Sequence, residues 1–136
     1  MGSTAVIGPE LADIITEGAA MVDGAEAAVL ECRTAPDPSS DLARACGKLV
    51  SRYLALARRV QTLPPTPATR RVYELLNYHM EIVAQASMLA FRPHDSHWGD
   101  LAAGFGDDLG FPATELRRLA ADVTRHPDTP VLLVAS

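Results

Sequence analysis

The chain has 136 residues, of which 48% are hydrophobic, 21% charged and 5% aromatic, and its formal net charge is −5. This length suits one domain that buries a core without disulfides or metal, and the composition excludes disordered, collagen-like and cysteine-stapled proteins. The abundance of Ala and Leu favours helix. We therefore expect a single helical domain over residues 1–136, with a flexible N-terminus over residues 1–8 and a C-terminal tail over residues 126–136.

Prolines divide the chain into helical stretches. Pro9 and Pro67 suit the first position of a helix, where the N–H group that proline lacks would be unpaired anyway. Other prolines follow apolar helical patterns and end them, because the proline ring clashes with the preceding turn. The pattern predicts three long helices, over residues 9–32, 40–63 and 67–91. Two glycines in the first helix predict that a neighbouring element approaches it closely.

The second of these helices carries the clearest apolar pattern. Apolar residues recur at alternating spacings of four and three, as in the core-facing stripe of a coiled coil. This heptad stripe consists of Leu42, Cys46, Leu49, Tyr53, Leu56, Val60 and Leu63. It predicts either the internal core of a bundle or an interface between two copies. For the second case we expect Leu49, Tyr53 and Leu56 to lie in a homodimer interface.

After Pro93 the helical pattern weakens. Residues 98–109 predict a short, glycine-interrupted helix and residues 112–125 a better one, so together they predict a helical hairpin. The apolar residues 131–135 are too few for a helix, and we expect them to dock on the bundle, join a neighbouring subunit or bind another protein. The predicted fold is all-α: a four-helix, up-and-down type bundle with a short C-terminal helical hairpin and no strands.

Charge is distributed in blocks along the chain. The net charge is −7 over residues 1–41 and +6 over residues 42–92, and the remaining residues are acidic again. Arg44, Lys48 and Arg52 recur at spacings of four and share one helical face. The overall negative charge and the lack of aromatic residues on that face argue against nucleic-acid binding. We expect acidic and basic helices to lie side by side, or an acidic protein to bind the basic face.

Histidines are the residues that best suggest a chemical site. His94, His97 and Asp100 form the pattern H-x-x-H-x-x-D, and imidazole and carboxylate groups are ligands for zinc, iron or manganese. His79 could add a ligand, since metal sites in bundles take side chains from facing helices. The Glu-x-x-His pairs of di-iron bundles are missing. The alternatives are a polar connecting segment for His94 and His97, and a hydrogen-bonded core residue for His79.

The two cysteines, Cys32 and Cys46, are too few for a disulfide framework, and no C-x-x-C motif is present. We expect Cys46 to be a small core residue. The chain has neither the features of a secretory signal nor an apolar run long enough to span a bilayer. These features predict a soluble, cytoplasmic protein with reduced cysteines and no membrane association.

No specific catalytic motif accompanies these patterns. The leading hypothesis is a non-catalytic accessory or regulatory protein without a cofactor, which acts through protein–protein interaction and forms a homodimer. Its interaction residues would be Arg44, Lys48 and Arg52 together with the three residues of the heptad stripe assigned above. The alternative is a bundle, including an enzyme, that binds a divalent metal or small ligand through His79, His94, His97 and Asp100.

Overall fold

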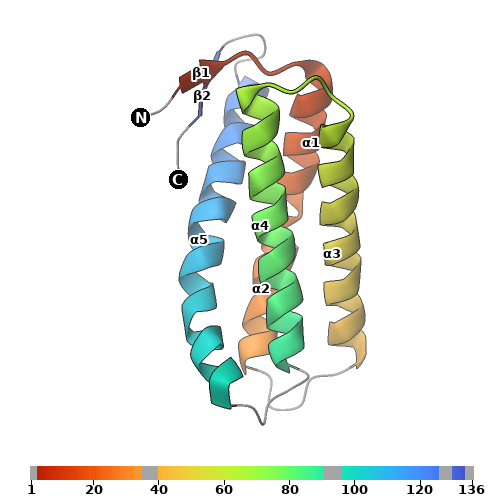
Figure 1. Cartoon of the computed structure of the whole chain (residues 1–136), viewed down its shortest axis with the longest axis vertical. Coiled ribbons are helices and arrows are strands. Elements are labelled where there is room, and N and C mark those ends of the chain that lie inside the picture. The colour runs from red at the N-terminus through yellow and green to blue at the C-terminus, as the bar shows by residue number, and fades with distance from the viewer. Residues whose placement is uncertain (1–2, 35–39, 91–95, 126–129, 134–136) are drawn as a thin grey trace.

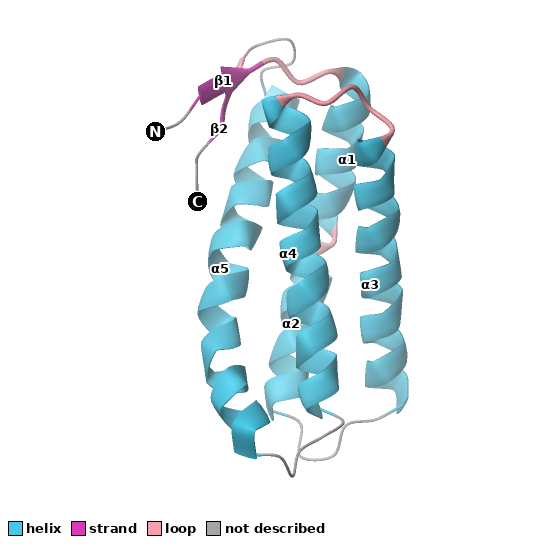
Figure 2. Ribbon diagram, viewed as in Figure 1, coloured by secondary structure: helices cyan, strands magenta, loops and turns pink. Residues whose placement is uncertain are grey.

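The computed structural model describes residues 3–34, 40–90, 96–125 and 130–133. These residues form five helices and two short strands, and the helices pack together along one long axis (Figures 1 and 2). The structure is therefore predominantly helical, as the sequence predicts. Among the helices so described, none is long and apolar enough to cross a membrane.

The first predicted helix is divided into two. Helix α1 spans Pro9–Ala20 and α2 spans Val22–Thr34, and α2 follows α1 towards the other end of the molecule (Figure 1). Between them, the N–H group of Met21 donates to the carbonyl oxygen of Gly18 at 3.2 Å. This bond to the third preceding residue tightens the last turn of α1 and interrupts the regular helix.

The next two helices begin and end close to the predicted positions. Helix α3 spans Ser40–Gln61 and α4 spans Pro67–Ala90, and they run in opposite directions (Figure 1). At the start of α4, the backbone N–H of Thr69 donates to Oγ1 of Thr66 at 3.1 Å, and the N–H of Thr66 donates to Oγ1 of Thr69 at 2.8 Å. These reciprocal bonds satisfy donors that a helix start leaves unpaired, so they fix where α4 begins.

Helix α4 lies at the centre of the packing. It contacts α2 and α3, and it also contacts α5, which spans Ser96–Arg125. Its buried face includes Val72, Leu75, Leu76, Ile82, Val83 and Ala86. This wide face agrees with the apolar pattern that the sequence places on a central helix.

The heptad stripe of α3 belongs to this core. Tyr53 is fully buried within the single chain and Leu56 is 4% exposed, while Leu49 is half-buried. Tyr53 and Leu56 are therefore not available to a partner, because they cover the apolar face of α4 instead. The prediction that these two side chains lie in a homodimer interface is wrong, and only Leu49 keeps an accessible part.

The predicted C-terminal hairpin is also wrong, because residues 96–125 form one helix with Pro112 inside it. A proline inside a helix removes one hydrogen bond and costs about 3 kcal/mol. The residues after Pro112 offset this cost, since Ala113, Leu116 and Leu119 are almost completely buried. Tertiary packing thus keeps α5 continuous where the local sequence favours a break.

Two strands that the sequence analysis missed join the chain ends. Strand β1 (Ser3–Ala5) pairs antiparallel with β2 (Val131–Leu133), so part of the N-terminus predicted to be flexible is ordered. Within β2 the first and last residues are buried and the middle one is exposed. The carbonyl oxygen of Leu132 accepts a bond from Nη2 of Arg118 on α5 at 2.5 Å. Residues 131–133 of the apolar tail therefore dock on the bundle, which was one of the predicted alternatives, while residues 134 and 135 lie outside the described residues.

The two glycines of the first helical stretch differ in their surroundings. A Cβ atom at Gly18 would lie 3.1 Å from Cδ2 of Leu76 and 3.2 Å from Cδ2 of Leu116, whereas one at Gly24 would meet nothing within 4 Å. The expectation of a close approach is thus confirmed at Gly18, where side chains of α4 and α5 fill the space. Gly24 faces open space.

These surroundings predict opposite effects of larger side chains. Gly24→Ala should raise the free energy of unfolding by about 0.5–1 kcal/mol, because alanine loses less backbone entropy in a helix. Gly18→Leu should lower it by about 1–3 kcal/mol, since the added atoms overpack the contact with Leu76 and Leu116. Urea denaturation measures both changes. Equal stability of the two variants would contradict the close packing at Gly18.

Candidate functional site

His79, the residue that could add a ligand to the predicted metal site, is a core residue. Its side chain is fully buried on α4, and Nδ1 lies 3.2 Å from the hydroxyl oxygen of Tyr53 on α3. The two rings meet edge to face, with their centroids 5.3 Å apart and their planes at 80°. The hydrogen-bonded core histidine, one of the two interpretations of the sequence, is the arrangement observed.

The described residues do not test the rest of the predicted metal site. His94 lies outside them, and His97 and Asp100 lie in a part of α5 where only the backbone is described. The backbone carbonyl of Pro112 is next to the His79 ring. At the helical rise of about 1.5 Å per residue, the backbone of His97 lies about 22 Å and that of Asp100 about 18 Å along α5 from Pro112. The α5 residue next to His79 is thus Pro112, and a site at His94, His97 and Asp100 stays a prediction.

Burial controls the protonation of the Tyr53–His79 pair. Removal from water lowers the pKa of His79 below its usual 6.5, and the Pro112 carbonyl opposes this shift only in part. The same loss of hydration raises the pKa of Tyr53. Nε2 of His79 has no partner with hydrogen-bond geometry in the described part of the chain. The pair is therefore neutral at neutral pH, and it stabilises the core rather than forming an accessible acid–base site.

Ion pairs link the acidic first helices to basic residues of two other helices. Arg59 on α3 donates to Glu17 on α1 at 2.8 Å. Arg117 on α5 donates to Glu26 on α2 at 3.0 Å and also to Asp23. The expectation that acidic and basic helices lie side by side is confirmed at the contact between α1 and α3. Arg117 adds single basic contacts from α5, a helix that is acidic overall.

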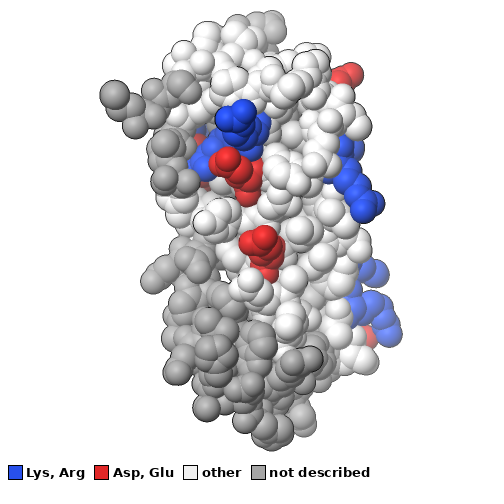
Figure 3. Space-filling view, viewed as in Figure 1, with Lys and Arg blue, Asp and Glu red and all other residues white. Residues whose placement is uncertain are grey.

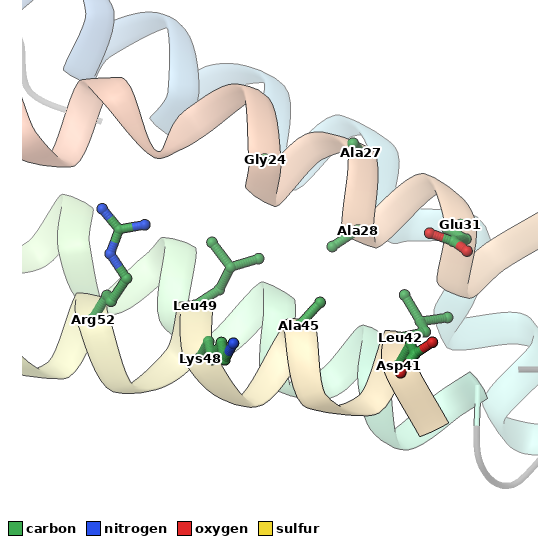
Figure 4. A pocket seen from close by; sticks show the side chains of 10 residues that line it. All are labelled: Gly24, Ala27, Ala28, Glu31, Asp41, Leu42, Ala45, Lys48, Leu49 and Arg52. Carbon is green, nitrogen blue, oxygen red and sulfur yellow. The ribbon is translucent and has the colours of Figure 1, made fainter. Parts of the chain in front are cut away.

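A groove lies between α2 and α3 on the described surface. Its volume is about 500 Å³, and Figure 4 shows its two walls, formed by the facing sides of the two helices. The α2 wall is made of small residues and one acidic residue, whereas the longer α3 wall carries apolar, acidic and basic residues. The lining residues are Gly24, Ala27, Ala28, Glu31, Asp41, Leu42, Ala45, Lys48, Leu49 and Arg52.

Opposite charges lie at the two ends of this groove. Figure 4 shows Glu31 and Asp41 at one end, Lys48 and Arg52 towards the other, and small or apolar side chains between them. Asp41 forms an exposed contact of 3.5 Å with Arg44. Among the described side chains, no ion pair within 4.0 Å uses Glu31, Lys48 or Arg52. Most of the charge along the groove is thus left without an internal partner.

Three of the six predicted interaction residues line the groove. Lys48, Leu49 and Arg52 do so, whereas Arg44 is exposed outside it. Figure 3 shows several basic side chains along the edge formed by α3, and a mixed group of basic and acidic side chains over α4. The sequence analysis missed the α2 wall, because alanine and glycine carry no chemical signal. Their spacing of three and four on one face was the available indication.

Comparison of the chain with protein-family models, curated proteins and solved structures gives no match. The groove and the buried core are therefore the features from which a function can be inferred.

The lowered pKa of His79 predicts how stability depends on pH. The unfolded chain binds a proton near pH 6.5 and the folded chain only at lower pH, so stability is complete above pH 6.5 and falls as the pH decreases below it. The contribution of His79 to the change in the free energy of unfolding approaches about 1.4 kcal/mol per pH unit. Urea denaturation at about pH 5.5 and about pH 7.5 measures the change.

Two variants separate this effect from the loss of the hydrogen bond. His79→Gln should remove this part of the pH dependence, because the titrating group is gone. Tyr53→Phe should keep it but lower the free energy of unfolding at both pH values by about 1–3 kcal/mol, since Nδ1 of His79 loses its buried partner. An unchanged slope in His79→Gln would contradict the assignment.

Proposed function

We propose that the protein is a non-catalytic, cytoplasmic interaction protein that forms a homodimer through the α2–α3 groove and needs no cofactor. Its fold would then belong to the four-helix, up-and-down type of bundle, with one face used for association. The observation that supports this proposal is the self-complementary charge along the groove. Glu31 and Asp41 lie at one end, and Lys48 and Arg52 lie towards the other.

A twofold axis makes this charge pattern attractive. In a symmetric dimer both copies use the same surface. If residue i of the first copy contacts residue j of the second, then residue j of the first copy contacts residue i of the second. If the axis passes through the middle of the groove, the acidic end of each copy faces the basic end of its partner. Each interface then contains the acid–base contacts twice. A parallel arrangement would instead place like charges together, which is unfavourable.

The middle of the groove suits close contact between helices. Ala27 and Ala45 are exposed, and a Cβ atom at Gly24 would meet open space, so the walls present little side-chain bulk. The half-buried side chain of Leu49 supplies an apolar anchor between the charged ends. Small residues let a partner helix come near the backbone, and removal of the apolar atoms from water drives the association.

The chemistry of the groove favours binding over catalysis. Its lining contains no imidazole, hydroxyl or thiol side chain, and its carboxylates lie at the opposite end from its two basic groups instead of converging on one point. The buried histidine, His79, is enclosed in the core and is not a lining residue. The groove therefore supports the interaction hypothesis and offers no support for an enzyme at this position.

Charge reversal and its rescue test the proposed pairing. Lys48→Glu with Arg52→Glu should weaken the dimer at least about tenfold, because two acidic ends then meet. Adding Glu31→Lys and Asp41→Lys should restore much of the affinity, since the pattern becomes self-complementary again in reverse. Sedimentation equilibrium measures the dissociation constant of each variant.

A matched control separates this effect from a change in net charge. Arg58→Glu with Arg70→Glu changes the charge by the same amount at exposed positions outside the groove. This control should leave the dissociation constant within a factor of about three at moderate salt, where distant exposed charges are screened. Equal weakening by both pairs, or no recovery in the fourfold variant, would contradict the pairing.

Apolar positions of α3 provide a second test. Leu49→Asp should convert the dimer to a folded monomer, because the side chain lines the groove and is only half-buried. Leu56→Asp, seven residues further on, should unfold the protein, since it places a charge in the core. Light scattering with circular dichroism distinguishes the outcomes. A Leu49→Asp variant that remains dimeric would exclude this groove as the interface.

A further inference from the structure

The two cysteines of the chain are in contact across two helices. Cys32 lies on α2 and Cys46 on α3, and their Sγ atoms are 3.7 Å apart, although 14 positions separate them in the sequence. Both thiols are free and buried, with Cys46 1% and Cys32 7% exposed. Two sulfurs at van der Waals contact need only a small rearrangement of their side chains to reach bonding geometry.

The position of the pair gives a bond between them a structural effect. Cys32 follows Ala28 by one helical turn, and Cys46 follows Leu42 by one turn, so the sulfurs lie at the acidic end of the groove between α2 and α3. Among the side chains that the structure describes, no group of three metal-ligating residues is present, so the pair does not belong to a metal site there. Its chemistry is that of two adjacent thiols.

We propose that Cys32 and Cys46 form a reversible oxidation site, in which a small peroxide converts the two thiols into an intramolecular disulfide that joins α2 to α3. The thiol–thiol contact across the two helices carries this assignment, which does not depend on the proposed dimer. Reduction by a cellular dithiol or glutathione returns the two thiols.

The reaction with hydrogen peroxide balances in two steps. One thiolate attacks a peroxide oxygen, the O–O bond breaks, and the products are a sulfenic acid and, after proton transfer, one water molecule. The second cysteine then attacks the sulfenic sulfur, an S–S bond forms, and the hydroxyl group leaves with a proton as a second water molecule. Each sulfur is oxidised by one electron, and the two peroxide oxygens are reduced.

Burial makes this oxidation slow and dependent on pH. Removal from water, together with the neighbouring Cys46, raises the pKa of Cys32 to about 12. Only the thiolate reacts with peroxide. While the pH is below this pKa, each increase of one pH unit should therefore make a reaction that starts at Cys32 about tenfold faster.

The disulfide should stabilise the fold without linking two copies. It closes a loop of 14 residues, which restricts the unfolded chain. For a domain of this size the expected rise in Tm is about 5–10 °C, provided that the bond fits the native helix spacing. The stability of α2 against α3 thereby depends on the redox state of the solution.

Intact mass spectrometry of the full chain tests the proposal directly. Treatment with hydrogen peroxide should lower the monomer mass by about 2 Da, and peptide mapping without reduction should join Cys32 to Cys46. Dithiothreitol should restore the original mass. A mass increase from sulfinic acid at single cysteines, disulfide-linked dimers, or no change after prolonged treatment at about pH 9, where the thiolate fraction is larger, would each overturn the assignment.

Single alanine variants provide the matched control, with folding checked by circular dichroism. Cys32→Ala and Cys46→Ala should both lose the 2 Da change and the peroxide-dependent rise in Tm, because a disulfide needs both sulfurs. If one variant fails to fold, the other still decides the result. These readouts are made on the mass and stability of the monomer, so they are independent of whether reduced protein dimerises through the groove.

Discussion

The hydrogen bond between Tyr53 and His79 fixes how α3 packs on α4, and the rest of the structure follows from that packing. An apolar interface alone tolerates a shift by one helical turn, but a buried imidazole without a partner costs about 1–3 kcal/mol. The bond at 3.2 Å therefore favours one register of the two helices. With the heptad stripe turned towards α4, the adjacent side of α3 faces α2. Because α2 presents alanine and glycine there, the two helices leave a groove instead of a filled interface.

The main helices could be predicted from the sequence because their signals are local. Pro67 marks the start of α4, and the reciprocal bonds between Thr66 and Thr69 confirm the reason. The errors arise where tertiary contacts override local preference. Pro112 remains inside α5 because the residues after it are buried, and the strands β1 and β2 are only three residues long and pair across the entire chain. Neither contact leaves a periodic pattern in the sequence.

The candidate site was only partly predictable for a related reason. The periodicity shows that one face of α3 is covered, but the same stripe fits either an internal core or a dimer interface. Only the packed structure shows that Tyr53 and Leu56 are buried within the single chain. The charges of Lys48 and Arg52 were visible, whereas the opposing wall of α2 carries little chemical signal. The contact between Cys32 and Cys46 depends on how α2 and α3 align, which spacing alone does not determine. Similarly, the position of the Pro112 carbonyl next to His79 depends on how α4 and α5 align, which spacing alone does not determine.

The central claim is self-association through the α2–α3 groove, and a concentration series of amide NMR spectra on the reduced protein tests it most directly. Such spectra report both whether the chain associates and which residues change. The account predicts concentration-dependent shifts or broadening at Gly24, Ala45 and Leu49 and at their neighbours on the two helices, with smaller changes at the core residue Val83. Identical spectra from about 10 μM to about 1 mM, together with the translational diffusion of a monomer at the highest concentration, would contradict it, because even weak dimers of millimolar affinity become visible there. Changes confined to β1, β2 or α5 would contradict it as well.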